Sequence, residues 1–532
     1  LSRSERPHGG RPRPRVALWP RRSVAGRAPP TSEGRSLCCP SLQKFRRDLR
    51  PHPLTGPTDL PYVLHPGLGK LVVAFPPSPP DWSGVPKLRN DEALPGQSIQ
   101  GRVDGAQRDV PSRFIGKDLL EGRTVGVGGG DEDAQQHEFF ELPEANLRHE
   151  EPMNLFEVYP LLPIELVKAK GCHVFDKKGN KYLDLYGGHA VISIGHTHPH
   201  YVKRITRQLK KIGFYSNSVI NSLQIDLADK LGQLSGYNNY QLFLCNSGAE
   251  ANENAIKVAS FNNPKKTLIA FEGGFHGRTS RTLSITDNLK YRSPLDEFEN
   301  VVFLPLNDEN AFRTAMDKED VCAVIIEGIQ GLGGIYTPSN SFLKLLREET
   351  FQHDSLLILD EVQSGYGRTG HFFAHQHANI APDIITIAKG MGNGFPIGGV
   401  LYHPSIQSWH GMSGTTFGGN QLACAAGLAV LEVLVEEGLI QKAAQQGNQW
   451  IEALISLPGV KAVRGRGLMI GIEMNFTIQS LREKLRVDHH ILTGTSVNPN
   501  TIRLLPPLTA GKKELDVLIK ALEHELKTKA TA

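Results

Sequence analysis

Two short apolar runs that each end on a charged residue constrain this sequence most. Leu356–Leu359 leads directly into Asp360, and Ile384–Ile387 is followed closely by Lys389. Short runs of leucine and β-branched residues bounded by glycine-rich turns are typical of buried parallel strands. In an open α/β sheet, ligands bind in the crevice at the carboxyl ends of such strands. A carboxylate and a lysine at that edge favour a cofactor site built around the lysine amine.

Further apolar runs alternate with helical patterns along the chain. Strands are predicted at Val174–Asp176, Tyr182–Leu185, Asn239–Leu244, Thr267–Phe271, Val301–Leu304, Val321–Glu327 and Gly399–Tyr402, and within Val460–Glu473 and Thr501–Leu508. Helices are predicted at Tyr201–Lys211, Leu223–Leu234, Ala249–Phe261 and Lys513–Lys527, and within Ser413–Leu434. Such alternation predicts a large α/β domain with a predominantly parallel sheet.

Composition narrows the class of protein. A chain of 532 residues with 39% hydrophobic residues can bury a large core, in more than one domain. Its net charge of +4 is small for this length and does not indicate binding to nucleic acid or to an anionic membrane. No apolar run is long enough to cross a bilayer. The six cysteines have no metal-ligand spacing, which favours reduced thiols and a cytoplasmic location.

Residues 1–152 differ in composition from the rest of the chain. They hold 21 of the 35 prolines, with 18 arginines and only 4 lysines. Such a segment cannot supply a packed core, so we expect it to be disordered. The composition of the first 47 residues fits a transit peptide, but a segment of 152 residues is far too long to be one. A regulatory tail is another possibility, but the segment contains no recognisable motif that supports it. The favoured hypothesis is a non-native extension, with translation starting at Met153.

Three regions are expected after this break. Residues 153–205 form an N-terminal segment with a hairpin and a loop, residues 206–429 form the large domain, and residues 430–532 form a smaller C-terminal domain. His196, His198 and His200 alternate as metal ligands can, but Pro199 interrupts them and no acidic residue or cysteine accompanies them. A structural loop is the better interpretation, and no metal site is expected.

Two glycine-containing turns add to the predicted site. The turn at Gly248 and Ala249 joins a strand to a helix, so free N–H groups could cradle a phosphate. The segment Glu272–Thr279 has three glycines around Phe275 and is expected to be an exposed loop. Alone, each feature has a plain structural explanation, and Lys389 could be an ion-pair partner of Asp360. Together they are the parts needed to hold pyridoxal phosphate.

The motifs NSGAEANE, FHGRT, LDEVQSGYGRTG, AKGMGNGFPIGG, TTFGGN and RGRGLMIGIE resemble those of class III aminotransferases. These belong to the fold-type I pyridoxal-phosphate superfamily, and the acetylornithine/succinylornithine branch is the most similar. The resemblance covers residues 153–532. It implies a large domain with a mostly parallel sheet, a smaller α+β C-terminal domain, and a homodimer with shared active sites.

The resemblance assigns cofactor roles to residues of this chain. Lys389 would carry the cofactor and then act as the base, and Asp360 would pair with the pyridine nitrogen. The other implied contacts are Val362 and Phe275 on the two ring faces, Gln363 at the phenolic oxygen, Gly248 and Ala249 at the phosphate, and Thr416 reaching it from the second subunit.

Substrate roles follow in the same way. Arg278 and Arg503 resemble the residues that take substrate carboxylates, and Arg is suited to this because its planar fork meets a carboxylate with two hydrogen bonds. Glu327 resembles a gate that pairs with Arg503 when the amine substrate is bound and moves away for the dicarboxylate. Thr415 would contact the acyl group.

The motifs also depart from the family pattern in places. Gly328 and Leu332 stand where many relatives have Pro and Glu, which weakens any detailed transfer of substrate preference. Ornithine δ-aminotransferases tend to carry Tyr where this chain has Gly188. An N-acylated ornithine, acetylated or succinylated, is therefore the expected donor, with 2-oxoglutarate as acceptor, in arginine biosynthesis. The alternatives are another ω-aminotransferase, an aminomutase, or an inactive cofactor-binding scaffold.

Overall fold

The computed structural model of the protein describes residues 62–64, 71–73, 155–296 and 299–530. The chain divides into two compact units, Leu1–Val158 and Tyr159–Ala532. In the first unit, strand β1 (Tyr62–Leu64) pairs antiparallel with β2 (Leu71–Val73). The prediction for residues 1–152 otherwise lies outside the described residues.

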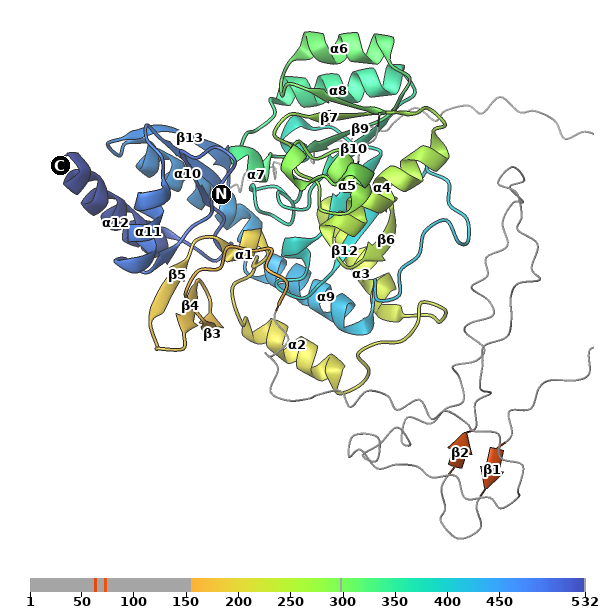
Figure 1. Ribbon diagram of the computed structural model, residues 1–532, viewed down its shortest axis with the longest axis horizontal. Helices are drawn as coiled ribbons and strands as arrows, with labels where there is room; N and C mark the ends of the chain where they lie inside the picture. The colour runs from red at the N-terminus through yellow and green to blue at the C-terminus, as the bar shows by residue number, and fades with distance from the viewer. Residues whose placement is uncertain (1–61, 65–70, 74–154, 297–298, 531–532) are drawn as a thin grey trace, which may run out of the picture. The chain divides into compact units, whose positions relative to one another are not determined.

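A seven-stranded sheet lies at the centre of the second unit (Figure 1). Its strands, in spatial order, are β6 (Gln241–Cys245), β12 (Gly398–Tyr402), β11 (Ile384–Ile387), β10 (Leu356–Asp360), β9 (Val321–Glu327), β7 (Thr267–Phe271) and β8 (Val301–Leu304). Strand β12 is antiparallel to both neighbours, and the other pairs in this sheet are parallel. The predicted, predominantly parallel sheet is confirmed.

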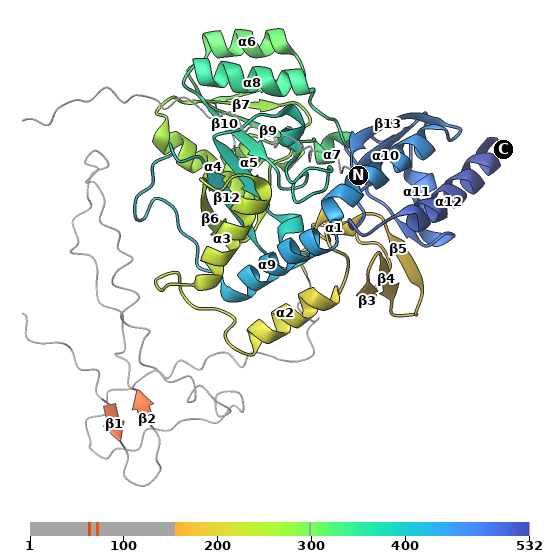
Figure 2. The ribbon, with the colours of Figure 1, turned by 180° about the vertical axis from the view of Figure 1, so that it is seen from behind.

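Helices cover both faces of this sheet, which is why its strands are continuous apolar runs. On β7, Leu268 and Ala270 join the apolar cluster under α4 (Gly248–Asn262). The alternate residues Ile269 and Phe271 join the cluster that includes side chains of α6 (Glu309–Lys318) and α8 (Asn340–Gln352). Figures 1 and 2 both show α6 and α8 together on one side of the sheet and α4 on the other.

The N-terminal hairpin shares a sheet with the C-terminal part of the chain. Strands β3 (Leu166–Lys170), β4 (His173–Asp176) and β5 (Lys181–Asp184) are antiparallel, and β15 (Ile491–Leu492) pairs parallel with β5. The Asp176 carboxylate accepts hydrogen bonds from the N–H groups of Lys178 (3.0 Å) and Asn180 (2.8 Å), which fixes the predicted turn.

A third sheet and several helices complete the second unit. The sheet order is β13 (Val460–Arg466), β14 (Met469–Met474) and β16 (Thr501–Leu504), all antiparallel. The longer helices are α2 (Pro199–Leu209), α3 (Ser222–Ser235), α9 (Gln421–Glu436), α10 (Leu439–Ile455), α11 (Gln479–Val487) and α12 (Lys512–Ala530). The short helices are α1 (Gly187–Ala190), α5 (Ser280–Ser284), α7 (Gly331–Gly334), and the 3-10 helices Leu289–Tyr291, Pro294–Asp296, Ala374–Ala378 and Lys389–Met391.

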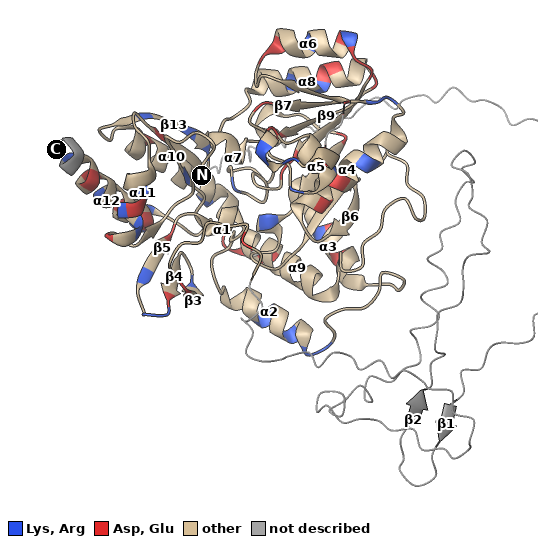
Figure 3. Cartoon of the chain, viewed as in Figure 1, with Lys and Arg blue, Asp and Glu red and all other residues tan. Residues whose placement is uncertain are grey.

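Charges of both signs are distributed over α4, α6 and α8 (Figure 3). On these helices the acidic and basic side chains lie close together in sequence, as Arg313 and Asp317 do on α6. Among the described residues, no helix is both long enough and apolar enough to cross a membrane.

Replacing Gly447 on α10 by Ala should destabilise the fold. A Cβ atom there would lie 2.2 Å from the carbonyl oxygen of Gly467, in the turn between β13 and β14. Overpacking of this kind costs about 1–3 kcal/mol, although Ala favours a helix by about 1 kcal/mol over Gly. The free energy of unfolding in urea should therefore fall. Asn448→Ala, at the next and exposed position of the same helix, is the control, and equal losses in both variants would contradict the packing argument.

Candidate active site

Asp360, at the end of β10, is a buried carboxylate held by groups from three segments. Its Oδ2 atom accepts hydrogen bonds from Asn252 Nδ2 on α4 (2.8 Å) and from His276 Nδ1 after β7 (2.7 Å). Its Oδ1 atom accepts from the N–H group of Val362 (3.0 Å). Hydrogen bonds to an ionised carboxylate offset the cost of removing it from water. A negative charge is thus fixed at the tip of the central strand.

Lys389 follows β11, the neighbour of β10, and begins a 3-10 helix with a left-handed φ of 46°. Burial lowers the pKa of its amine, while the charges of Asp360 and Glu327 raise it and that of Arg503 lowers it further. Lowering the pKa increases the fraction of uncharged amine, which is the nucleophilic form. The structure thus brings the predicted lysine and carboxylate to the same end of the sheet.

The start of α4 lies against the loops that follow β10 and β7. Ser247 caps the helix, and its Oγ accepts a hydrogen bond from the N–H group of Glu250 (3.2 Å). A Cβ atom on Gly248 would lie 2.5 Å from Val362 Cγ1, and one on Gly277 would lie 2.8 Å from Ala249 Cβ. Glycine is needed at both positions for this close approach. The first N–H groups of the helix have no acceptor within the helix, so they can bind an anion.

Gln363 brings a polar atom without a partner to this site. Its Nε2 donates to the carbonyl oxygen of His189 (3.2 Å). Its Oε1 atom is buried and has no hydrogen-bond partner among the described residues. A buried polar atom of this kind is costly unless something binds to it. This atom, the glycine-lined start of α4 and the fixed Asp360 charge all fit a bound phosphorylated aromatic cofactor.

Glu327 and Arg503 are both buried, but they bond to different partners. Glu327 accepts hydrogen bonds from the N–H groups of Phe275 (3.0 Å) and Gly331 (2.9 Å). Burial raises the pKa of Glu327 to about 7, and the neighbouring His276 opposes this rise. Arg503, on β16, donates to the Thr495 carbonyl oxygen and to Tyr186 Oη (3.2 Å). Burial also lowers the pKa of Arg503, and Tyr186 and Glu327 oppose that shift.

The remaining predicted substrate residues lie in exposed or half-buried loops. The guanidinium of Arg278 lies 3.5 Å from the centre of the Tyr291 ring. Thr415 Oγ1 accepts hydrogen bonds from the N–H group of Gly418 (3.1 Å) and from Asn246 Nδ2 (3.2 Å), which ties it to the residue before the α4 cap. Thr416 is exposed. Neither Arg278 nor Thr416 bonds to the cluster around Asp360 among the interactions of the described chain.

The prediction of an exposed loop at Glu272–Thr279 is wrong for its centre. His276 is buried, because its ring bonds to Asp360 and its N–H group donates to Thr286 Oγ1 (3.0 Å). Sequence reasoning also missed Asn252 and Tyr186. The signal for Asn252 is an amide on the otherwise apolar, small-residue face of α4, among Ala251, Ala255 and Ile256.

A cavity of about 930 Å³ lies next to the site. Its lining includes Tyr186 and Gly188 from the segment after β5, and Arg482 from α11. Tyr186 connects it to the site, because its Oη atom also accepts the hydrogen bond from Arg503. A Cβ atom on Gly188 would meet no atom within 4 Å, so the space beside this residue is open.

The three alternating histidines bind three different carboxylates. The ring of His196 lies 2.8 Å from Asp184, that of His198 2.8 Å from Glu437, and that of His200 2.7 Å from Glu432. The rings therefore pair separately, as expected of a structural loop.

Comparisons with known proteins agree with this geometry. The family model "Aminotransferase class-III" matches residues 157–526. Acetylornithine aminotransferase from Bacillus subtilis is 39% identical over 379 residues, covering 70% of this chain and 97% of its own length. The enzyme of that name from Mycolicibacterium smegmatis is 40% identical, with 70% and 96% covered.

Solved structures lead to the same family. Acetylornithine aminotransferase from Elizabethkingia anophelis matches with a TM-score of 0.63 and 32% identity, covering 70% of this chain and 96% of that one. Ornithine aminotransferase from Toxoplasma gondii matches with a TM-score of 0.67 and 28% identity, covering 71% and 93%, and a second structure of that enzyme reports PLP at its active site. The chain belongs to the class-III aminotransferases of fold-type I, which are enzymes that depend on pyridoxal phosphate.

Proposed function

We propose that this protein transfers the δ-amino group of an N-acylated ornithine to 2-oxoglutarate, giving the N-acylglutamate semialdehyde and glutamate, in arginine biosynthesis. The observation that supports the reaction type most is the half-buried Lys389, with its lowered pKa, at the same end of the sheet as the buried, hydrogen-bonded carboxylate of Asp360. The substrate is supported by the relatives named acetylornithine aminotransferase, which are 37–40% identical over nearly their whole length.

Pyridoxal phosphate supplies an electron sink beside the substrate carbon when it is bound. We assign Lys389 to the cofactor aldehyde, and afterwards to moving the proton at the substrate carbon, because an amine with a lowered pKa suits both tasks. Asp360, whose carboxylate accepts hydrogen bonds from Asn252 and His276, would keep a proton on the pyridine nitrogen.

We propose the remaining cofactor contacts from the resemblance to the family. The N–H groups of Gly248 and Ala249 would bind the phosphate, and the Gln363 amide would bind the phenolic oxygen. Val362 and Phe275 would cover the two faces of the ring. Val362 packs on Gly248 at the start of α4, and the N–H group of Phe275 donates a hydrogen bond to Glu327.

Charged side chains would select the substrates. Arg503 and Arg278 would each receive a substrate carboxylate, with Glu327 near Arg503 as the group that discriminates between the amine and the dicarboxylate. Thr415 would contact the acyl group. Gly188 would leave room for that group, and the open space beside it and the adjoining cavity support this.

We further propose a cytoplasmic homodimer in which Thr416 reaches the partner's cofactor. Thr416 is exposed beside Phe417, which is itself 60% exposed and packs on Phe214 at a ring-centroid distance of 5.2 Å. An exposed aromatic pair next to an exposed predicted ligand suits an interface between subunits. Residues 206–429 and 430–532 are proposed as the large and small domains, with 153–205 as the N-terminal segment.

Replacing Lys389 by Ala should abolish transamination and remove the visible absorption of the cofactor-loaded protein. Loss of a general base alone costs about 10²–10⁴-fold in rate, and here the anchoring amine is lost as well. Stopped assays for glutamate and an absorption spectrum check both effects. Lys344→Ala, at an exposed position on α8, is the control. An active Lys389→Ala enzyme with an unchanged spectrum would overturn the assignment.

Replacing Glu327 by Gln should remove a pH dependence from the binding of 2-oxoglutarate. The wild-type carboxyl, with its pKa raised to about 7, gains its charge as the pH rises through that value. The charged form competes with the dicarboxylate for Arg503, so the wild-type KM should rise, by at most about tenfold per pH unit. The amide cannot ionise, and its KM should stay flat. The KM for the amino donor, measured in the same series, is the internal control. Identical profiles for both enzymes would refute the gate.

Gly188→Tyr should shift preference from N-acetylornithine towards ornithine. The ring would occupy open space where the acyl group is proposed to lie, and we expect the ratio of kcat/KM values for the two donors to change by about tenfold or more. Gly188→Ala has the same backbone strain at φ +56° without the ring, and should keep the wild-type ratio. N-succinylornithine and 4-aminobutyrate complete the panel. An unchanged ratio in the Tyr variant would contradict the proposed acyl position.

A further inference from the structure

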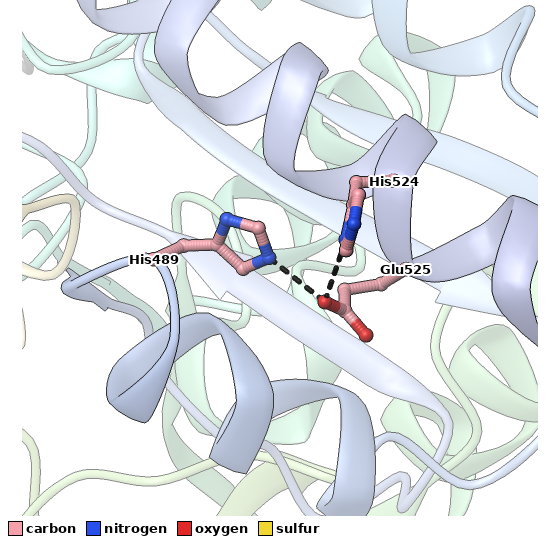
Figure 4. A group of neighbouring side chains, drawn as sticks. All are labelled: His489, His524 and Glu525. Atoms are coloured by element: carbon pink, nitrogen blue, oxygen red, sulfur yellow. Dashed lines mark hydrogen bonds and ion pairs between the residues drawn. The ribbon is translucent and has the colours of Figure 1, made fainter.

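A cluster of potential metal ligands lies in the C-terminal part of the chain (Figure 4). His524 and Glu525 are on α12, and His489 follows the end of α11. Both imidazoles lie within hydrogen-bond distance of the same carboxylate oxygen. His489 Nε2 is 2.8 Å and His524 Nδ1 is 3.1 Å from Glu525 Oε1. We propose that these three side chains form a binding site for a divalent metal ion of the zinc class.

The separations of the ligand atoms suit such an ion. The three atoms lie within 4.8 Å of one another. A tetrahedral zinc site with bonds of about 2.0–2.1 Å places its ligand atoms about 3.3 Å apart. The imidazole nitrogens of His489 and His524 therefore need to move outward from Glu525 Oε1 by only a few tenths of an ångström, and to settle about 3.3 Å from each other. His524 can do so easily, because 67% of its side chain is exposed.

The donor set is also suitable in kind. Two imidazole nitrogens and one carboxylate oxygen form a set that zinc uses in proteins, with a fourth position left for water. Glu525 is buried, and its two carboxylate oxygens face different partners, with Lys484 at Oε2 and both imidazoles at Oε1. A buried carboxylate oxygen that faces two imidazoles is a better anchor for a cation than an exposed acidic group.

Lys484 is the competing cation at this cluster. Its Nζ atom lies 2.8 Å from Glu525 Oε2, the oxygen that neither imidazole contacts. Its side chain is 52% exposed, so it can turn away into solvent when a metal ion binds to Oε1. Its charge opposes metal binding, so its removal should tighten the site. This expectation separates a metal site from a purely structural network, in which Lys484 has only a stabilising role.

A bound ion would join α12 to the segment after α11. This segment already meets α12 through His489 and Glu525, and α11 itself meets α12 through Lys484 and Glu525. Metal that binds the folded form and not the unfolded form stabilises the fold by mass action. Nothing in the sequence indicates the site, because His489 and His524 are distant in sequence and have no recognised ligand spacing.

The test uses the full-length, cofactor-loaded protein without an affinity tag, treated with a chelator and dialysed. Zinc ions are then titrated by calorimetry, and bound zinc is counted by atomic absorption. The wild type should bind one ion more than His524→Gln, or bind it at least about tenfold more tightly, and its unfolding temperature should rise with zinc while that of the variant does not. His410→Gln removes an exposed histidine outside the cluster and should match the wild type.

Lys484→Met provides a second arm, since it should bind zinc more tightly than the wild type. Equal zinc stoichiometry and affinity in the wild type and in His524→Gln would overturn the proposal and leave the cluster as a hydrogen-bonded network. So would a Lys484→Met protein whose zinc affinity is unchanged or lower.

Discussion

The active-site end of this protein depends on one buried charge. Asp360 is removed from water at the tip of β10, where an unpaired carboxylate would be strongly destabilising. Asn252, His276 and the backbone of Val362 each donate a hydrogen bond to it. These donors come from α4, from the loop after β7 and from the loop after β10, so satisfying the charge also fixes three segments relative to one another.

The same three segments form the rest of the site. Because Gly248 and Gly277 have no side chains, the start of α4 can approach Val362 and the loop after β7 within van der Waals distance. That approach leaves the first N–H groups of α4 next to the residues around Asp360. Lys389 arrives from the adjacent strand in a left-handed conformation, and Glu327 arrives from β9 on the other side of β10. Three neighbouring parallel strands thus each deliver one ionisable residue to the same edge.

The strands of the central sheet were predictable because they are buried on both faces and therefore appear as uninterrupted apolar runs. The bounds of β7, β8 and β11 coincide with the predicted ranges. Asp360 is the last residue of β10, and Lys389 follows shortly after β11. The pairing of β5 with β15 was not predictable, because the short strand Ile491–Leu492 has no pattern of its own and is fixed by its neighbours. His276 was misjudged for a related reason. A glycine-rich loop is normally exposed, and only the fold shows that its histidine bonds to a carboxylate from a distant strand.

The central claim is that Lys389 is the residue that carries the cofactor. Reducing the cofactor-loaded wild-type protein with borohydride makes that linkage permanent, and peptide mass spectrometry then locates it. We expect a single modified peptide with the pyridoxyl phosphate mass on Lys389. Modification of a different lysine, or a protein that carries none after reduction, would contradict it.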